Sequence, residues 1–173
     1  LLRTVTTLGG LARPIYSPRA LEKVLEEYLG DARLHTTLSE ILVTAYDMAS
    51  STPWFFKTSF AKYHRSATDD PLLTQVVRAT SAAPTYFPPL TMGDHCLIDG
   101  GVFAANPALC AYAQARNMYP KEKEFLVVSL GTGWQAHNRP CSQVRKWGIL
   151  GWVVPISTVM LNASSATVDY QMR

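Results

Sequence analysis

The chain has 173 residues, of which 47% are hydrophobic and 17% are charged, and its formal net charge is +3. One domain of this length can bury about 70% of the surface that its unfolded chain would expose. The apolar content is that of a globular protein, so disordered, collagen-like and coiled-coil chains are excluded. So small a net charge, without a clustered basic face, gives no indication of a nucleic-acid partner.

The first half of the chain predicts one helix and two strands. Ser17-Pro18 is a helix start signal, because Ser can cap free amides and Pro fits the first turn. Apolar residues then recur at helical spacing up to Gly30, which predicts an amphipathic helix over residues 18–29. Residues 41–46 and 54–58 are rich in β-branched or aromatic side chains and flank a turn cluster, so we expect two strands there.

The second half continues this alternation. Asp70-Pro71 repeats the cap-and-proline signal and predicts a helix that Pro84 ends. A short apolar strand at residues 96–98 runs into Asp99, and Asn106-Pro107 opens a third helix. Residues 125–130 are apolar on both faces, as in strands that are covered on two sides. Alternating strands and helices indicate an α/β protein.

Residues 125–168 contain no Asp or Glu. The segment instead carries three basic residues and three tryptophans, namely Arg139, Arg145, Lys146, Trp134, Trp147 and Trp152. Its uncharged part, residues 147–163, is short for a membrane span and is interrupted by Gly and Pro. Two interpretations stay open: an interfacial segment, because Trp and basic residues favour the headgroup level, or a helix packed over the sheet.

Asp99-Gly100-Gly101 is the most informative candidate site. In open α/β sheets, ligands bind beyond the carboxyl ends of the strands, where we expect this Asp to lie. The two glycines allow a close approach that side chains would block. The alternative is a tight turn in which Asp and Gly are ordinary turn residues.

Residues 129–133 (SLGTG) resemble a loop that cradles phosphate, since glycines free backbone amides to point at an anion. The segment lacks the second half of any phosphate-binding motif, which favours a structural exit from the strand. A nucleophile is also hard to find, because the sequence has no G-x-S-x-G. Ser81 and Ser129 lack flanking glycines, so we expect both to be structural.

The histidines and cysteines indicate no metal site. The four histidines are scattered singly, without an H-E-x-x-H motif or an i, i+4 pair: His35, His64, His95 and His137. His95, four residues before Asp99, is expected to be a surface or hydrogen-bonded residue. The three cysteines (Cys96, Cys110, Cys141) form no C-x-x-C pair, which fits a reducing compartment or buried thiols.

Four motifs occur in order along the chain: ATSAAPTYFP at residues 79–88, LIDGGV at 97–102, NPA at 106–108 and VSLGTG at 128–133. Together they resemble the patatin-like phospholipase family. The resemblance implies a three-layer α/β/α fold with a mainly parallel central sheet. The family's glycine-rich oxyanion loop and serine elbow are absent from this sequence. We therefore expect residues 1–173 to form one domain, the C-terminal portion of a patatin-like domain that is incomplete at its N-terminal side.

The resemblance also implies a lipid acyl hydrolase that uses a Ser-Asp dyad, without histidine, metal or cofactor. By this match Asp99 is the dyad aspartate, and Gly100 and Gly101 complete the D-G-[AG] motif. An ordinary Asp, with a pKa of about 3.9, is a poor base at neutral pH. The apolar neighbours at residues 97–98 and 102–103 would desolvate Asp99 and raise its pKa.

Three hypotheses of function follow. The first is a lipid acyl hydrolase that acts on phospholipids or related acyl esters. We expect residues 1–173 alone to lack this activity. The second is a catalytically inactive lipid-binding or interaction module, and the third is a nucleotide-binding domain that uses residues 129–133. Because residues 1–10 lack the pattern of a signal peptide, we expect a cytoplasmic protein. We also expect peripheral membrane contact through Trp147 and Trp152, and no nucleic-acid partner.

Overall fold

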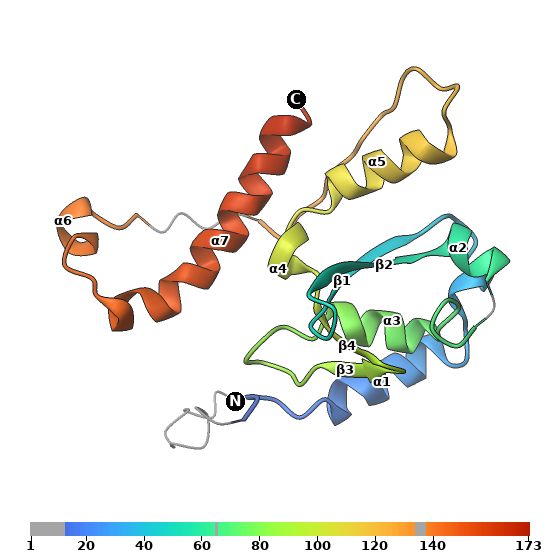
Figure 1. The fold of residues 1–173 in the computed structure, drawn as a ribbon, viewed down its shortest axis with the longest axis horizontal. Helices are drawn as coiled ribbons and strands as arrows, with labels where there is room; N and C mark the ends of the chain where they lie inside the picture. The colour runs from blue at the N-terminus through green and yellow to red at the C-terminus, as the bar shows by residue number, and fades with distance from the viewer. Residues whose placement is uncertain (1–12, 65, 134–137) are drawn as a thin grey trace. The chain divides into compact units, whose positions relative to one another are not determined.

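The structure, a computed structural model, describes residues 13–64, 66–133 and 138–173 (Figure 1). The expectations that concern residues 1–10, Trp134 and His137 lie outside the described residues. The chain divides into two compact units, of which the first ends at Phe103 and the second spans Ala104–Arg173. Each unit is described by itself.

A four-stranded sheet forms the centre of the first unit. Its strands are β1 (Leu42–Asp47), β2 (Thr52–Lys57), β3 (Leu90–Met92) and β4 (His95–Asp99), in the order β2-β1-β4-β3. The strands expected at residues 41–46, 54–58 and 96–98 are confirmed within one or two residues, and β3 was not predicted. The mixture of strands and helices is that of an α/β protein, as expected.

The expected mainly parallel sheet is not found among these four strands, because every pairing is antiparallel. The connections explain the antiparallel pairing of β1 with β2 and of β3 with β4. Short turns join β1 to β2 and β3 to β4, and a parallel pair would need a crossover of a dozen residues or more. The turn between β3 and β4 contains Gly93 at φ +58°, a backbone conformation that favours glycine.

The first unit also contains helices. They are α1 (Arg19–Leu29), the 3₁₀ helix η2 (Leu34–Thr36), α2 (Thr58–Tyr63) and α3 (Leu73–Thr80), and the short α4 (Gly101–Ala104) runs across the boundary between the units. The helix predicted at residues 18–29 is α1, and Ser17 Oγ accepts a hydrogen bond of 3.5 Å from Arg19 N. Helix α3 packs against the sheet and α1 packs against α3, so both lie on the same side (Figure 1).

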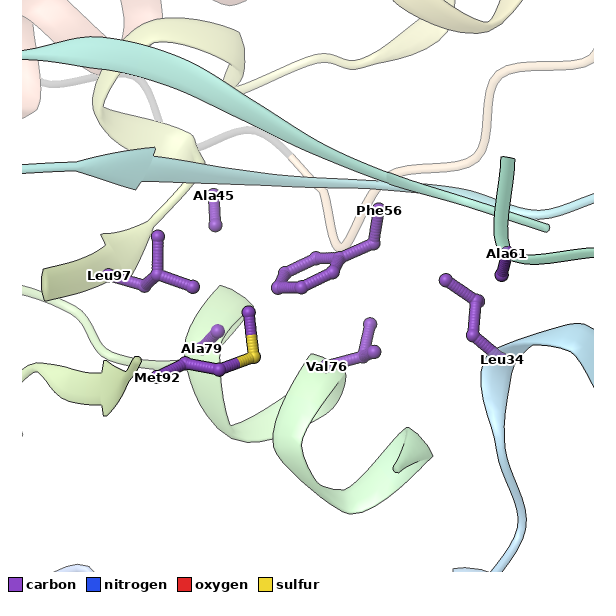
Figure 2. Close-up of a cluster of buried hydrophobic side chains, with 8 residues drawn as sticks. All are labelled: Leu34, Ala45, Phe56, Ala61, Val76, Ala79, Met92 and Leu97. Atoms are coloured by element: carbon purple, nitrogen blue, oxygen red, sulfur yellow. The ribbon is translucent and has the colours of Figure 1, made fainter. Parts of the chain in front are cut away.

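The core lies between the sheet and α3. Figure 2 shows its buried side chains, which come from the sheet, α3, α2 and η2: Leu34, Ala45, Phe56, Ala61, Val76, Ala79, Met92 and Leu97. Val76 and Ala79 lie on one face of α3, and Ala45, Phe56 and Leu97 come from three adjacent strands. Burial of Leu97 anchors β4, the strand that carries Asp99 at its end.

Asp70 does not cap α3, which corrects the interpretation of Asp70-Pro71 as its start. The helix begins at Leu73, and the side chain of Gln75 accepts a hydrogen bond from Leu72 N at 3.1 Å. The buried Asp70 carboxylate instead accepts hydrogen bonds from His35, at 3.0 Å from the backbone N and at 2.6 Å from Nδ1. It therefore joins η2 to the segment that precedes α3.

The second unit contains α5 (Ala108–Met118), α6 (Cys141–Val144) and α7 (Ile149–Gln171), and α5 contacts α7. The helix predicted after Asn106-Pro107 is α5. Helix α7 continues through Gly151 and Pro155, which were expected to interrupt the segment. None of the helices in the described residues is long and apolar enough to cross a membrane.

The prediction of a doubly covered strand at residues 125–130 is wrong for the structure described. The segment has no regular secondary structure, and Leu126 and Leu130 are 93% and 90% exposed. A strand requires a neighbour for its backbone hydrogen bonds, and no described strand pairs with this segment. The ring of Phe125 packs against that of Tyr112, with centroids 5.7 Å apart.

Candidate active site

Asp99 is the last residue of β4, and both its backbone and its side chain are held in place. It lies opposite Ala45 in the pairing of β4 with β1, and its backbone N donates a hydrogen bond of 3.1 Å to Ala82 O. The sheet thus fixes one side of the residue, and the segment after α3 fixes the other. The half-buried carboxylate is positioned by regular structure, as sequence analysis expected of the end of this strand.

Two opposing effects set the pKa of the Asp99 carboxyl. Burial raises the pKa, and the Gly101 backbone N–H, which donates to Oδ1 at 2.7 Å, lowers it. Burial dominates, so the pKa lies above its ordinary value. A carboxylate with a raised pKa is a better general base near neutral pH than an ordinary Asp.

The two glycines after Asp99 have different roles. A Cβ on Gly100 would clash with the Thr44 hydroxyl and with the Thr44 backbone, so this position has no room for a side chain. Thr44 cannot easily yield, because it pairs with Phe55 in the sheet and its carbonyl accepts a hydrogen bond from Thr80 Oγ1 at 2.8 Å. Gly101 supplies the N–H that holds the Asp99 carboxylate. A hydrogen bond between residues two apart is that of an Asx turn, and the contact of Gly100 with Thr44 adds a packing constraint to this turn.

Among the described residues, no side-chain hydroxyl forms a hydrogen bond with the Asp99 carboxylate. Ser81 follows the end of α3, and its backbone N donates to Val77 O at 3.0 Å. Ser129 is exposed and belongs to the second unit. The described residues therefore present a positioned carboxylate with no side-chain hydroxyl hydrogen-bonded to it.

Sequence reasoning missed the buried carboxylate of Asp47, which is 1% exposed at the end of β1. Its Oδ1 accepts hydrogen bonds from Ala49 N and Cys96 N, both at 3.0 Å. Its Oδ2 accepts them from Ser50 Oγ at 2.8 Å and His95 Nδ1 at 2.9 Å. Burial alone would raise the pKa of Asp47, but these hydrogen bonds, led by that from His95, outweigh it and hold the pKa far below its usual range.

The hydrogen bonds around Asp47 hold the end of β1 to the turn that follows it and to the start of β4. The His95 ring packs on Trp54 of β2 with centroids 4.2 Å apart, so it is held by that ring as well as by Asp47 of β1. A turn-forming Asp followed by serines was visible in the sequence at residues 47–51. No local pattern linked that turn to His95, which lies 48 residues further along the chain.

Comparison with known proteins adds the evidence of ancestry. A model of the family described as patatin-like phospholipase matches residues 3–112, a range that contains Asp99, Gly100 and Gly101. The chain belongs to this family. The similarity to patatins also extends beyond the matched range, over nearly the whole chain.

Three similar proteins illustrate the extent of this similarity. "Probable inactive patatin-3-Kuras 1" of Solanum tuberosum is 32% identical over 94% of this chain and 49% of its own length. "Patatin-07" of the same species is 31% identical over 95% of this chain and 48% of its own length. "Patatin-like protein 2" of Oryza sativa subsp. indica is 31% identical over 96% of this chain and 48% of its own length. The chain thus spans about half the length of the curated patatins that it matches.

The histidines that the structure describes occupy separate places. His35 binds Asp70, His95 binds Asp47, and the ring of His64 stacks on Phe60 with centroids 4.1 Å apart. Within residues 13–64, 66–133 and 138–173, no group of three or more His, Cys, Asp or Glu side chains could hold a metal ion. The described cysteines are all free.

The glycine-containing loop at residues 129–133 lines a cavity of about 470 Å³ in the second unit, together with Asn106 and Asp169. Asn106 Nδ2 donates to Asp169 Oδ1 at 2.8 Å. The described lining includes a carboxylate but no Lys or Arg, a combination that disfavours the phosphates of a nucleotide. The nucleotide-binding hypothesis therefore gains no support from this cavity.

Proposed function

We propose that this chain is the aspartate-bearing, C-terminal portion of a patatin-like domain that hydrolyses acyl esters of phospholipids or related lipids. Asp99 is the aspartate of a Ser-Asp dyad in this proposal, and Gly100 and Gly101 shape the motif around it. The observation that carries the proposal is a half-buried carboxylate at a strand end, with a raised pKa and a fixed orientation. Membership of the patatin-like phospholipase family supplies the class of substrate.

Asp99 would act as the general base of the reaction. A serine hydroxyl is a weak nucleophile until a base accepts its proton, and a carboxylate whose pKa is raised by burial is suited to that step. The serine would attack the ester carbonyl and release the alcohol, and water would then release the fatty acid. These 173 residues contain no G-x-S-x-G, so we propose that they do not catalyse this reaction alone.

The partner in this proposal is an acyl lipid, met at a membrane surface from the cytoplasmic side. Trp147 and Trp152 would make the peripheral contact. No cofactor, metal ion or nucleic acid takes part in the proposed reaction.

A second candidate function is an inactive lipid-binding or interaction module with the same fold. One observation favours it, the printed name of a relative: "Probable inactive patatin-3-Kuras 1". Such a module would bind lipid vesicles without releasing fatty acid, whereas the hydrolase would do both.

The deciding experiment compares Asp99→Asn with Asp94→Asn in the longest natural form of the protein. Asp94 is exposed in the turn before β4, so its substitution controls for loss of one negative charge. We expect Asp99→Asn to lower ester hydrolysis by about 100-fold or more, as is typical when a general base is removed, and Asp94→Asn to leave it unchanged. A folded Asp99→Asn variant with wild-type turnover would overturn the proposal. Vesicle binding without any hydrolysis by the wild type would favour the module.

A further inference from the structure

Helix α7 carries an exposed apolar stripe in its first three turns. This part of the helix is apolar around most of its circumference, since Leu150 and Leu161 are exposed on its other side. Six members lie together on one side and form the stripe: Ile149, Trp152, Val153, Ile156, Val159 and Met160. Their exposed fractions range from 37% to 84%. Large apolar side chains aligned in this way mark an interaction surface.

An aromatic pair lies at the N-terminal end of the stripe. The rings of Trp147 and Trp152 have centroids 5.3 Å apart and meet edge to face at 87°. Gly151 makes this arrangement possible, because a Cβ there would lie 2.9 Å from the Trp147 side chain. Trp side chains favour the boundary between lipid headgroups and acyl chains.

Basic side chains adjoin the aromatic pair. The guanidinium of Arg139 lies 5.6 Å from the centre of a Trp147 ring, and Arg145 and Lys146 are exposed between α6 and α7. No acidic residue occurs from residue 125 to residue 168, and the first carboxylate on α7 is Asp169, near its C-terminus. The apolar stripe, the aromatic pair and these three basic residues are called the α7 surface below.

We propose that the α7 surface binds the surface of a bilayer that contains anionic lipids, with the first three turns of α7 in contact with the headgroup region. The stripe would enter the acyl boundary, and the basic residues would pair with lipid phosphates and carboxylates. Peripheral segments bind membranes through buried apolar area plus attraction of their basic residues to anionic headgroups. This inference deepens the lipid contact in the proposed function, but it does not depend on Asp99.

Charge distinguishes this partner from a second copy of the chain. A second copy would present the same surface, in which residues 125–168 offer no carboxylate to pair with the three basic residues. An anionic bilayer offers both an apolar layer for the stripe and negative charge for the basic residues. The surface as a whole therefore fits a lipid bilayer better than it fits itself.

The first experiment measures co-sedimentation of the full protein with vesicles of phosphatidylcholine, with and without phosphatidylserine. Val153→Asp places a charge in the stripe, and Asn162→Asp, an exposed site away from it, is the matched control. We expect Val153→Asp to weaken binding by about tenfold or more and Asn162→Asp to bind nearly as the wild type does. Equal binding by the two variants, or no binding by the wild type, would overturn the proposal.

The second experiment tests the basic residues. We expect the double variant Arg145→Gln and Lys146→Gln to lose most of the preference for phosphatidylserine, and Lys121→Gln with Lys123→Gln, which removes two exposed charges elsewhere, to keep it. If the wild type is a dimer that Val153→Asp dissociates, and neither form binds vesicles, a second copy covers the stripe and the proposal fails. We expect Asp99→Asn to bind vesicles as the wild type does. Vesicle binding therefore tests the α7 surface, and ester hydrolysis separately tests the proposed role of Asp99.

Discussion

His95 Nδ1 donates a hydrogen bond of 2.9 Å to Asp47 Oδ2, and this pair joins the first residue of β4 to the last residue of β1. The two strands pair only over residues 45–47 and 97–99, so the contact reinforces a short ladder. Asp99 lies at the other end of β4. The stability of the Asp47 cluster therefore bears on the position of the proposed base.

Asp47→Asn should destabilise the first unit by about 3 kcal/mol. The substitution removes a buried charge whose partners include the His95 ring, and it leaves donors without a matching acceptor. Urea denaturation followed by circular dichroism measures the loss. Asp94→Asn, in the exposed turn between β3 and β4, should change the free energy of unfolding little. An unchanged midpoint for Asp47→Asn would contradict this account.

The contribution of Asp47 should depend on pH in a defined direction. Its folded pKa is lowered, so its stabilising effect is complete above the unfolded pKa of about 3.9 and is lost as the pH falls toward the folded value. We expect the difference in unfolding free energy between wild type and Asp47→Asn to be constant near neutral pH and to shrink below about pH 4. A difference that grew on acidification would show that the charge of Asp47 is not what stabilises the fold.

Asp99 should show the opposite linkage. Its folded pKa is raised, so the stability that protonation confers is present below the unfolded pKa and is lost as the pH rises through the folded value. At neutral pH the folded protein carries a desolvated charge, which Asp99→Asn removes while keeping an oxygen for the Gly101 N–H. Thermal unfolding should therefore give a higher midpoint for this variant at neutral pH, and a smaller gain in acid. A lower midpoint at neutral pH would contradict the expected cost of burying this charge.

Gly100→Ala should destabilise the protein by about 2 kcal/mol or more, because the new Cβ would overlap the Thr44 backbone in the centre of the sheet. Gly131→Ala is the matched control, since a Cβ there would meet nothing within 4 Å. Chemical denaturation of both variants checks the prediction. Equal stability would mean that β1 and β4 can separate at this point without cost.

Local patterns in the sequence were sufficient for the elements whose signals are themselves local. The apolar spacing after Pro18 predicts α1, and the composition on either side of the turn cluster between residues 46 and 54 predicts the strands β1 and β2. The proposed role of Asp99 came from the resemblance to a family, which four short motifs between residues 79 and 133 carry together. Each of these signals lies within about a dozen residues of the chain.

The failures share a dependence on distant residues. Asp70 resembled a helix cap, but its carboxylate binds His35, which lies 35 residues earlier. Residues 125–130 have the composition of an inner strand, and composition cannot supply the neighbour that such a strand needs. The Asp47–His95 pair spans 48 residues, and neither member has a neighbour in sequence that signals the other.

The β1–β2 hairpin has a consequence for how this protein can vary. Strand β1 places Thr44 beneath Gly100, Ala45 opposite Asp99 and Asp47 against His95, so one register serves three separate contacts. A shift of one residue would turn every side chain of β1 to the other face of the sheet. Insertions or deletions in the turn at residues 48–51 are therefore constrained by the geometry around Asp99, although the turn itself is exposed. Changes in the length of a loop are better tolerated where they do not shift the pairing of one strand with its neighbours.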